Sequence, residues 1–210
     1  MQRTAHVWVV PVVILLAAMS AQAGPVTIFS NLNSNPASLY DNNNGWTVSG
    51  SGFGPYSPAM AFTPSGTYVL TEIDVAIFGT EDDSIDLALY SDSGGVPGSV
   101  LASWTDIPLT FGCCGLDTVT PVSSITLNAG TQYWLLAYAD ADDPSAMDSW
   151  QWNNVGQSGP TWWSQFGASP GTEGAFDVLG DPAVPEPASA SLAVCAFALL
   201  GLIAKRRRRA

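Results

Sequence analysis

The sequence predicts an all-β fold, a single β-sandwich or jelly-roll-like domain, and three observations support this. Apolar residues alternate with polar ones in several short runs, which is typical of strands with one buried face. No long stretch has apolar residues at helical spacing. Glycine and proline, at 20 and 15 residues, recur between the short runs and supply turns. We expect an N-terminal signal peptide and a C-terminal transmembrane helix to flank this domain.

Residues 1–23 have the features of a secretory signal peptide. Arg3 gives a positively charged start, and residues 7–19 are apolar. Ala21 and Ala23 match the small-residue site that signal peptidase cleaves, so we expect the mature chain to begin at Gly24. The alternative is an uncleaved membrane anchor, which the short apolar run and the good cleavage site disfavour.

Residues 24–180 are the predicted β-sandwich ectodomain. The clearest alternation lies in 73–77 and 85–90, where isoleucine, leucine and valine occupy every second position. Turn residues at 91–98 separate the second run from 100–104. Residues 131–139 are apolar on both faces, which suits a central strand. Further strands are expected at 26–29, 46–49, 59–62, 68–70, 123–127, 149–152 and 175–179, with a loop at 30–44.

The C-terminal segment has three parts. Residues 181–187 are an expected linker that ends in Pro185, Glu186 and Pro187. Residues 188–204 carry no charge, and as a helix they would be about 25 Å long, at the short limit for a membrane span. Residues 205–210 are a basic tail that the positive-inside rule places in the cytoplasm, with Lys205, Arg206, Arg207, Arg208 and Arg209 as its stop signal. Alone, these features would fit an ordinary anchor.

These three parts, in this order, resemble the PEP-CTERM sorting domain of Gram-negative bacteria. The resemblance covers about 25 residues. It implies that Pro185, Glu186 and Pro187 are recognised by an exosortase, which removes the tail. It also implies a host that makes an extracellular polysaccharide matrix. The motif would be read by another enzyme and is not catalytic in this chain.

The middle of the chain resembles the choice-of-anchor β-domains of bacterial surface proteins, most closely the R type. The resemblance rests on residues 61–63, 87–92, 95–98 and 129–135. It implies a surface domain that different sorting tails can carry. It implies no catalytic residue and no ligand.

The distribution of charge excludes several functions. The chain has 18 acidic and 6 basic residues, for a net charge of -12. Residues 24–184 contain no lysine, arginine or histidine, because the only histidine is His6. Nucleic acid is therefore a poor partner. Histidine-dependent catalytic triads and histidine zinc sites cannot be built there. A glycosidase, which needs only two carboxylates, stays open as an alternative.

Tryptophans suggest a carbohydrate-binding surface. Four of them are concentrated in a short stretch: Trp150, Trp152, Trp162 and Trp163. In a strand over 149–153, the first two would share a face. Flat rings beside Asn and Gln could stack on sugar rings and leave amides for sugar hydroxyls. The competing interpretation is that these rings pack in the sandwich core, as aromatic residues often do.

Acids and cysteines give two weaker hypotheses. Asp140, Asp142 and Asp143 lie in a predicted loop and could bind calcium, although no EF-hand spacing is present. The alternative is a solvated acidic surface. Cys113 and Cys114 are adjacent, and export would place them in an oxidising compartment. They could form a disulfide with each other or with another chain. A structural loop clip is favoured over a redox switch, which would usually show C-x-x-C spacing.

We therefore expect a non-enzymatic surface or extracellular-matrix protein that binds exopolysaccharide. It would be anchored transiently in the inner membrane and then released to the cell surface or matrix. Signal peptidase and an exosortase would process it, and no cofactor is expected apart from calcium. The alternatives are a carboxylate-dependent glycosidase acting on matrix polysaccharide and a purely structural surface protein.

Overall fold

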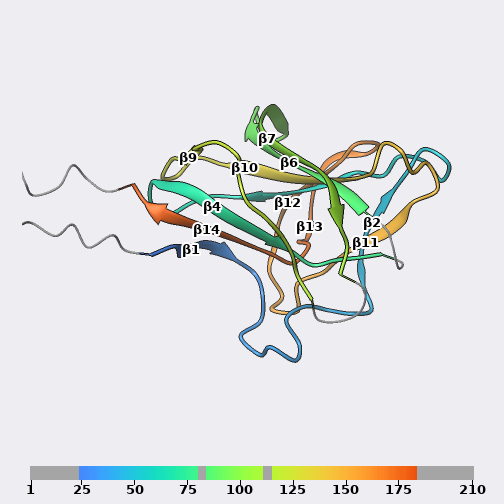
Figure 1. Cartoon of the computed structure of the whole chain (residues 1–210), viewed down its shortest axis with the longest axis horizontal. Helices are drawn as coiled ribbons and strands as arrows, with labels where there is room; N and C mark the ends of the chain where they lie inside the picture. Colours follow the sequence, from blue (N-terminus) through green and yellow to red (C-terminus); the bar gives the residue numbers. More distant parts are fainter. Residues whose placement is uncertain (1–23, 80–83, 111–114, 184–210) are drawn as a thin grey trace, which may run out of the picture. The chain divides into compact units, whose positions relative to one another are not determined.

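Fourteen strands make up the secondary structure of the part of the chain described by the computed structural model, residues 24–79, 84–110 and 115–183 (Figure 1). No helix occurs among these residues, so the predicted all-β fold is confirmed. Among them, no helix is long and apolar enough to cross a membrane. The signal peptide, the cysteine pair and the C-terminal segment from 184 onward lie outside the described residues.

The strands form three antiparallel sheets. The six-stranded sheet has the order β13 (Gly167–Thr172), β12 (Ser158–Trp163), β3 (Pro58–Phe62), β10 (Tyr133–Ala139), β6 (Ser84–Asp92) and β7 (Pro97–Pro108). The five-stranded sheet has the order β1 (Val26–Ser30), β14 (Phe176–Pro182), β4 (Tyr68–Val75) and β8 (Asp117–Val119), and β9 (Thr126–Leu127) also pairs with β4. The three-stranded sheet consists of β2 (Gly45–Ser49), β11 (Met147–Gln151) and β5 (Ile77–Phe78).

One hydrophobic core joins the three sheets. The alternation of the six-stranded sheet turns Met60, Leu87 and Leu135 toward this core, where each is fully buried. Phe176 of the five-stranded sheet and Trp150 of the three-stranded sheet enter the same cluster and are equally buried. Sheets that share one core are consistent with the expected sandwich.

The other face of the six-stranded sheet carries a second, smaller cluster. Trp134 and Leu136 of β10 lie there beside Ala59 and Ala61 of β3, and the partly buried Trp162 packs against them. The indole N–H of Trp134 donates to Asp92 Oδ1 at 2.8 Å. β12 therefore contributes to this cluster through Trp162, whereas its neighbour Trp163 points to the opposite face.

Both ends of the described domain leave the same sheet. β1 and β14 pair antiparallel, with Val26 opposite Gly180, so the first and last strands are neighbours. In Figure 1 both lead to the same side of the domain, while β2 and β11 lie at the other side. β14 extends to Pro182, so the expected linker begins later than predicted. Asp181 and Pro182 pair with β4 and belong to the sheet.

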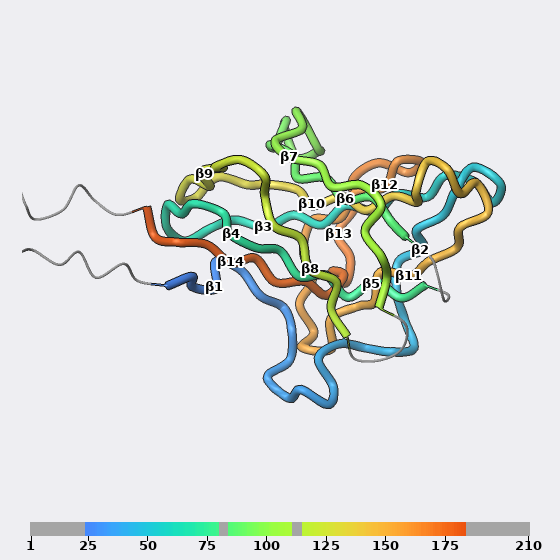
Figure 2. Tube along the Cα trace, viewed as in Figure 1, coloured from blue at the N-terminus to red at the C-terminus, as the bar shows by residue number. Residues whose placement is uncertain are grey.

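Most expected strands are present, but β8, β12 and β13 were not predicted. The two stretches expected at 68–70 and 73–77 form the continuous β4, followed by β5 after Ala76. Residues 31–44 form the expected loop, the blue segment that extends away from the strands in Figure 2.

Candidate functional site

Five aromatic side chains form a continuous row, which we call the aromatic ridge: Trp152, Trp46, Trp163, Tyr56 and Phe166. Ring centroids are 6.0 Å apart for Trp152 and Trp46, and 4.7 Å apart for Trp46 and Trp163. Trp163 then contacts Tyr56 at 5.8 Å and Phe166 at 5.9 Å. These four contacts are edge-to-face, whereas Tyr56 and Phe166 stack with 20° between their planes. Edge-to-face contacts lock the rings in fixed orientations.

Segments that are distant in the sequence build the ridge. Trp46 lies on β2, Trp163 ends β12, and Trp152 directly follows β11. Tyr56 precedes β3, and Phe166 lies in the turn between β12 and β13. Pairing of Trp163 with Pro58, at the start of β3, brings the end of β12 beside the segment that carries Tyr56. The ridge thus depends on the packing of several sheet ends.

Trp46 is held against the backbone of β13. Its indole N–H donates to the carbonyl of Thr172 at 2.7 Å. A Cβ atom on Gly171 would lie 3.1 Å from the Trp46 ring, closer than a relaxed contact. Glycine at this position therefore lets the ring approach the strand, and Trp46 bridges β2 and β13.

Ser164 fixes the outer part of the ridge by joining two loops. Its hydroxyl donates to the carbonyl of Pro55 at 2.9 Å and accepts from the N–H of Ser57 at 3.3 Å. Both contacts flank Tyr56. Phe166 beyond them is 73% exposed, whereas the other four rings are partly buried. The two loops therefore leave the Phe166 ring exposed to solvent, next to four rings that are held in place by packing.

Two of the four tryptophans predicted for a sugar-binding surface lie elsewhere. Trp150 is 0% exposed, and its indole N–H donates to the carbonyl of Ala175 at 3.0 Å. Its assignment to a binding face was wrong. Trp150 lies on the same face of the chain as Trp152, but at Trp150 this face is covered by the core. Trp162 lies on the opposite face of β12, in the cluster around Trp134. Trp152 and Trp163 belong to the ridge.

Trp46, Tyr56 and Phe166 were missed as site residues. Trp46 and Trp163 are 117 positions apart in the chain, and no local pattern links them. The run of tryptophans at 150–163 drew attention to local density, whereas the ridge arises from strand pairing. Two short stretches carried the one usable signal. In each of 53–57 and 163–167, two aromatic residues stand beside glycine and serine, with proline as well in the first stretch, and this composition predicts loops at a surface.

The three acids proposed for calcium make local hydrogen bonds. Asp140 accepts from the backbone N–H of Asp142 and from the hydroxyl of Ser84, both at 2.8 Å. Asp143 accepts from the N–H and the hydroxyl of Ser145 at 2.9 and 2.7 Å. These bonds lower the pKa of both carboxyls. Within residues 24–79, 84–110 and 115–183, no group of three or more metal-binding side chains is placed to hold an ion. Calcium binding by Asp140, Asp142 and Asp143 stays a prediction.

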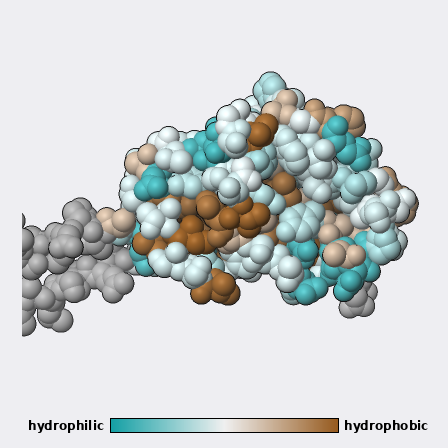
Figure 3. Space-filling model, turned by 90° about the horizontal axis from the view of Figure 1, so that it is seen from above, coloured by the Kyte–Doolittle hydropathy of each residue, from teal (hydrophilic) through white to brown (hydrophobic). Residues whose placement is uncertain are grey.

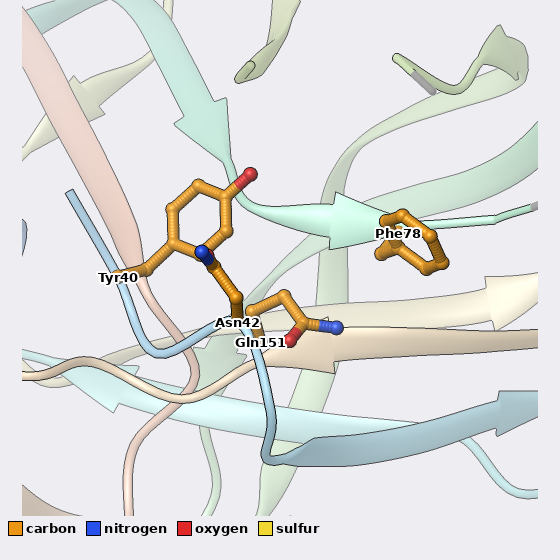
Figure 4. Close-up of a pocket in the computed structure, with 4 residues that line it drawn as sticks. All are labelled: Tyr40, Asn42, Phe78 and Gln151. Carbon is orange, nitrogen blue, oxygen red and sulfur yellow. The ribbon is translucent and has the colours of Figure 1, made fainter. Parts of the chain in front are cut away.

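A small pocket lies on the face of the three-stranded sheet that is turned away from the ridge. It is lined by Tyr40, Asn42, Phe78 and Gln151 (Figure 4). The hydroxyl of Tyr40 donates to the carbonyl of Gly115 at 3.1 Å, and burial, with the charge of Asp117, raises its pKa. Gln151 alternates with Trp150 and Trp152 and so faces away from the ridge. The pocket is small, at about 260 Å³ including space that is open to solvent.

Glu173 is the buried carboxyl beside the ridge. It follows Thr172, the residue that anchors Trp46, and it is 3% exposed. Gln157 donates to it at 2.9 Å, and burial raises its pKa. A Cβ atom on Gly159 would overlap its carboxylate, so the surrounding backbone encloses the acid. This arrangement supports the sheet and leaves the carboxyl without access to a polymer on the surface.

No protein-family model matches this chain, and no curated protein is significantly similar to it.

Proposed function

We propose that this protein is an exported surface or extracellular-matrix protein that binds polysaccharide through the aromatic ridge. The observation that carries the proposal is the continuous contact of five aromatic rings that ends in the exposed Phe166. Sugar rings present C–H groups on their faces and hydroxyls at their edges. An aromatic surface with amides nearby can meet both kinds of group without any charge.

The polar groups around the ridge support this chemistry. Asn44 and Gln165 are exposed next to ridge residues, and Asn44 accepts from the backbone N–H of Trp152 at 2.9 Å through its carbonyl. Their side-chain amides can donate to and accept from hydroxyl groups. The edge-to-face contacts also lower the cost of binding, because rings that are already fixed lose little side-chain freedom.

Export and sorting form the second part of the proposal. They are supported by the signal-peptide pattern at 1–23 and by the likeness of residues 185–209 to a PEP-CTERM sorting domain. The chain would be cleaved after Ala23, held by residues 188–204 and processed near Pro185, Glu186 and Pro187 by an exosortase. Deleting the exosortase of the host should leave a longer, membrane-retained form. Unchanged size and location would mean that the tail is a simple anchor.

Co-sedimentation with the insoluble matrix of the host tests the ridge. Trp163→Ala should weaken retention about tenfold or more, since it removes the central ring of the row. Trp162→Ala is the matched control, because it truncates the neighbouring tryptophan on the opposite face of the same strand. A second pair is Phe166→Ala and Val100→Ala, which truncate exposed apolar residues on and off the ridge. Equal losses within each pair would contradict ridge binding.

Two other outcomes would favour the alternatives. Sustained release of reducing sugar from the matrix would indicate a glycosidase. Absence of retention for the wild-type protein would favour a purely structural role.

A further inference from the structure

One end of the aromatic ridge lies beside an ionised carboxylate. The backbone N–H of Asp41 donates to the carbonyl of Trp152 at 2.8 Å, so the two residues are adjacent although far apart in the chain. The carboxylate of Asp41 accepts from the N–H of Asn43 at 2.8 Å and from the amide of Asn44 at 2.9 Å. These bonds lower its pKa and keep it charged.

Two more carboxylates lie near the loop that carries Tyr56, toward the other end of the ridge. Pro55 and Ser57, the neighbours of Tyr56, line a polar hollow together with Asp140 and Asp143. Both carboxylates accept short hydrogen bonds from serine hydroxyls, which hold the charged form in place. Their pKa values are lowered too. A polymer that lies along the ridge would therefore pass negative charge at both ends.

Nothing in the domain neutralises this charge. Residues 24–184 contain 17 acids and no lysine, arginine or histidine, so no side chain there can form an ion pair with a carboxylate, sulfate or phosphate. Figure 3 shows one face of the molecule, where most residues are of intermediate hydropathy around an apolar band. A surface that carries acids and no basic side chain suits uncharged hydroxyl-rich chains better than acidic ones.

We propose that the ridge selects polysaccharides without acidic groups, and that Asp41, Asp140 and Asp143 exclude acidic polymers from it. This inference rests on the proposed function and adds the class of ligand. The three residues act by like-charge repulsion at the ends of the ridge, and the aromatic rings supply the attraction. Because the repulsion acts through solvent, added salt weakens the discrimination.

Retention of the full chain on insoluble polysaccharides tests the proposal. The probes are a neutral panel of cellulose, curdlan and chitin, and cross-linked polygalacturonate as the acidic polymer, all in low salt with a calcium chelator. We expect retention on at least one neutral polymer and about tenfold less on polygalacturonate. The triple variant Asp41→Asn/Asp140→Asn/Asp143→Asn should raise retention on polygalacturonate severalfold without changing retention on the neutral polymer. Asparagine keeps one oxygen acceptor at each position. Asp143 accepts both of its bonds on that oxygen, whereas Asp41 and Asp140 each use a second oxygen that becomes an amide nitrogen, so the fold of the triple variant is checked by circular dichroism.

A matched variant separates local repulsion from net charge. Glu72→Gln/Asp74→Asn/Asp181→Asn removes the same number of charges from β4 and β14, outside the ridge. If it raises retention on polygalacturonate as much as the first variant does, the proposal is wrong. Equal retention of the wild type on neutral and acidic polymers also overturns it, but leaves the proposed function standing. Retention on no neutral polymer overturns both.

Discussion

Asp177 shows how one side chain can make the stability of the domain depend on pH. It lies on β14 directly opposite Asp74 of β4, and Glu72 is close by on the same strand. Burial, followed by the charge of Asp74, raises its pKa from 3.8 to about 6. A raised pKa means that the folded state holds this proton more tightly than the unfolded state does. The stability that Asp177 contributes to the folded state is therefore complete below pH 3.8 and is lost as the pH rises through about 6.

Asp177→Asn should reduce the fall in melting temperature that accompanies a rise from about pH 4 to about pH 7. Asparagine carries no charge to repel Asp74, so the variant should gain stability relative to the wild type at neutral pH. Thermal unfolding of the full chain across this range measures the effect. Asp41→Asn is the control, because that carboxyl has a lowered pKa and its loss cannot reduce the fall. Parallel curves for Asp177→Asn and the wild type would contradict the prediction.

Asp92 supports the buried Trp134 in the cluster outside the main core. Its Oδ1 accepts from the Trp134 indole and from the Gln132 amide, both at 2.8 Å. Asp92→Ala leaves the indole N–H of a fully buried residue without this acceptor, and should cost about 1–3 kcal/mol of stability. Asp92→Asn keeps an acceptor and should lose clearly less. Denaturant unfolding compares the two, and equal losses would show that the hydrogen bond contributes little.

Tryptophan positions show what could be predicted for single residues. Trp134 was expected in a buried central strand because its neighbours are apolar on both sides, and it is fully buried. Trp150 and Trp152 share a strand-like alternation with polar neighbours, so the pattern indicates one face without saying whether that face is covered. Trp150 is covered by Phe176, which lies on a strand 26 positions later in the sequence. Only the tertiary fold distinguishes the two.

At the scale of the elements, strands with regular alternation of large apolar residues were predicted, as in β4 and β6. The hairpin of β12 and β13 was missed because its sequence is rich in glycine, proline and serine, which usually indicate turns. β13 is the last strand of its sheet, where proline and small residues are tolerated. Since Trp163 and Phe166 belong to this hairpin, the ridge could not be predicted without it.

Packing between elements leads to a prediction at Gly174. A Cβ atom there would lie 2.7 Å from the ring of Trp150, which the core holds on all sides. Gly174→Ala should therefore destabilise the domain by about 1–3 kcal/mol, as expected for overpacking. Ser158→Ala, at an exposed position of β12, is the control and should change stability little. Denaturant unfolding of both variants measures this, and an unchanged midpoint for Gly174→Ala would mean that Trp150 can move.

At the scale of the whole molecule, the unbalanced charge opposes folding. Residues 24–184 hold 17 acids and no basic side chain, so charge interactions between side chains are repulsive throughout this segment. Sodium chloride should raise the melting temperature, most steeply below about 0.1 M, where screening begins to act over the distances between surface carboxylates. A melting temperature that is independent of salt, or that falls, would contradict this. Sodium sulfate at equal ionic strength helps to separate screening from effects on hydrophobic burial.

The pairing of β14 between β1 and β4 has a mechanical consequence. β14 runs toward the side where the chain leaves the domain, and in Figure 1 the strands that carry Trp46 and lead to Trp152 lie at the other side. If the C-terminal end is held while a polymer pulls on the ridge, the load is directed along β14. Two rows of hydrogen bonds, one to each neighbour, would then be loaded in shear and would have to break together. Such an arrangement resists pulling far better than one in which bonds open one at a time.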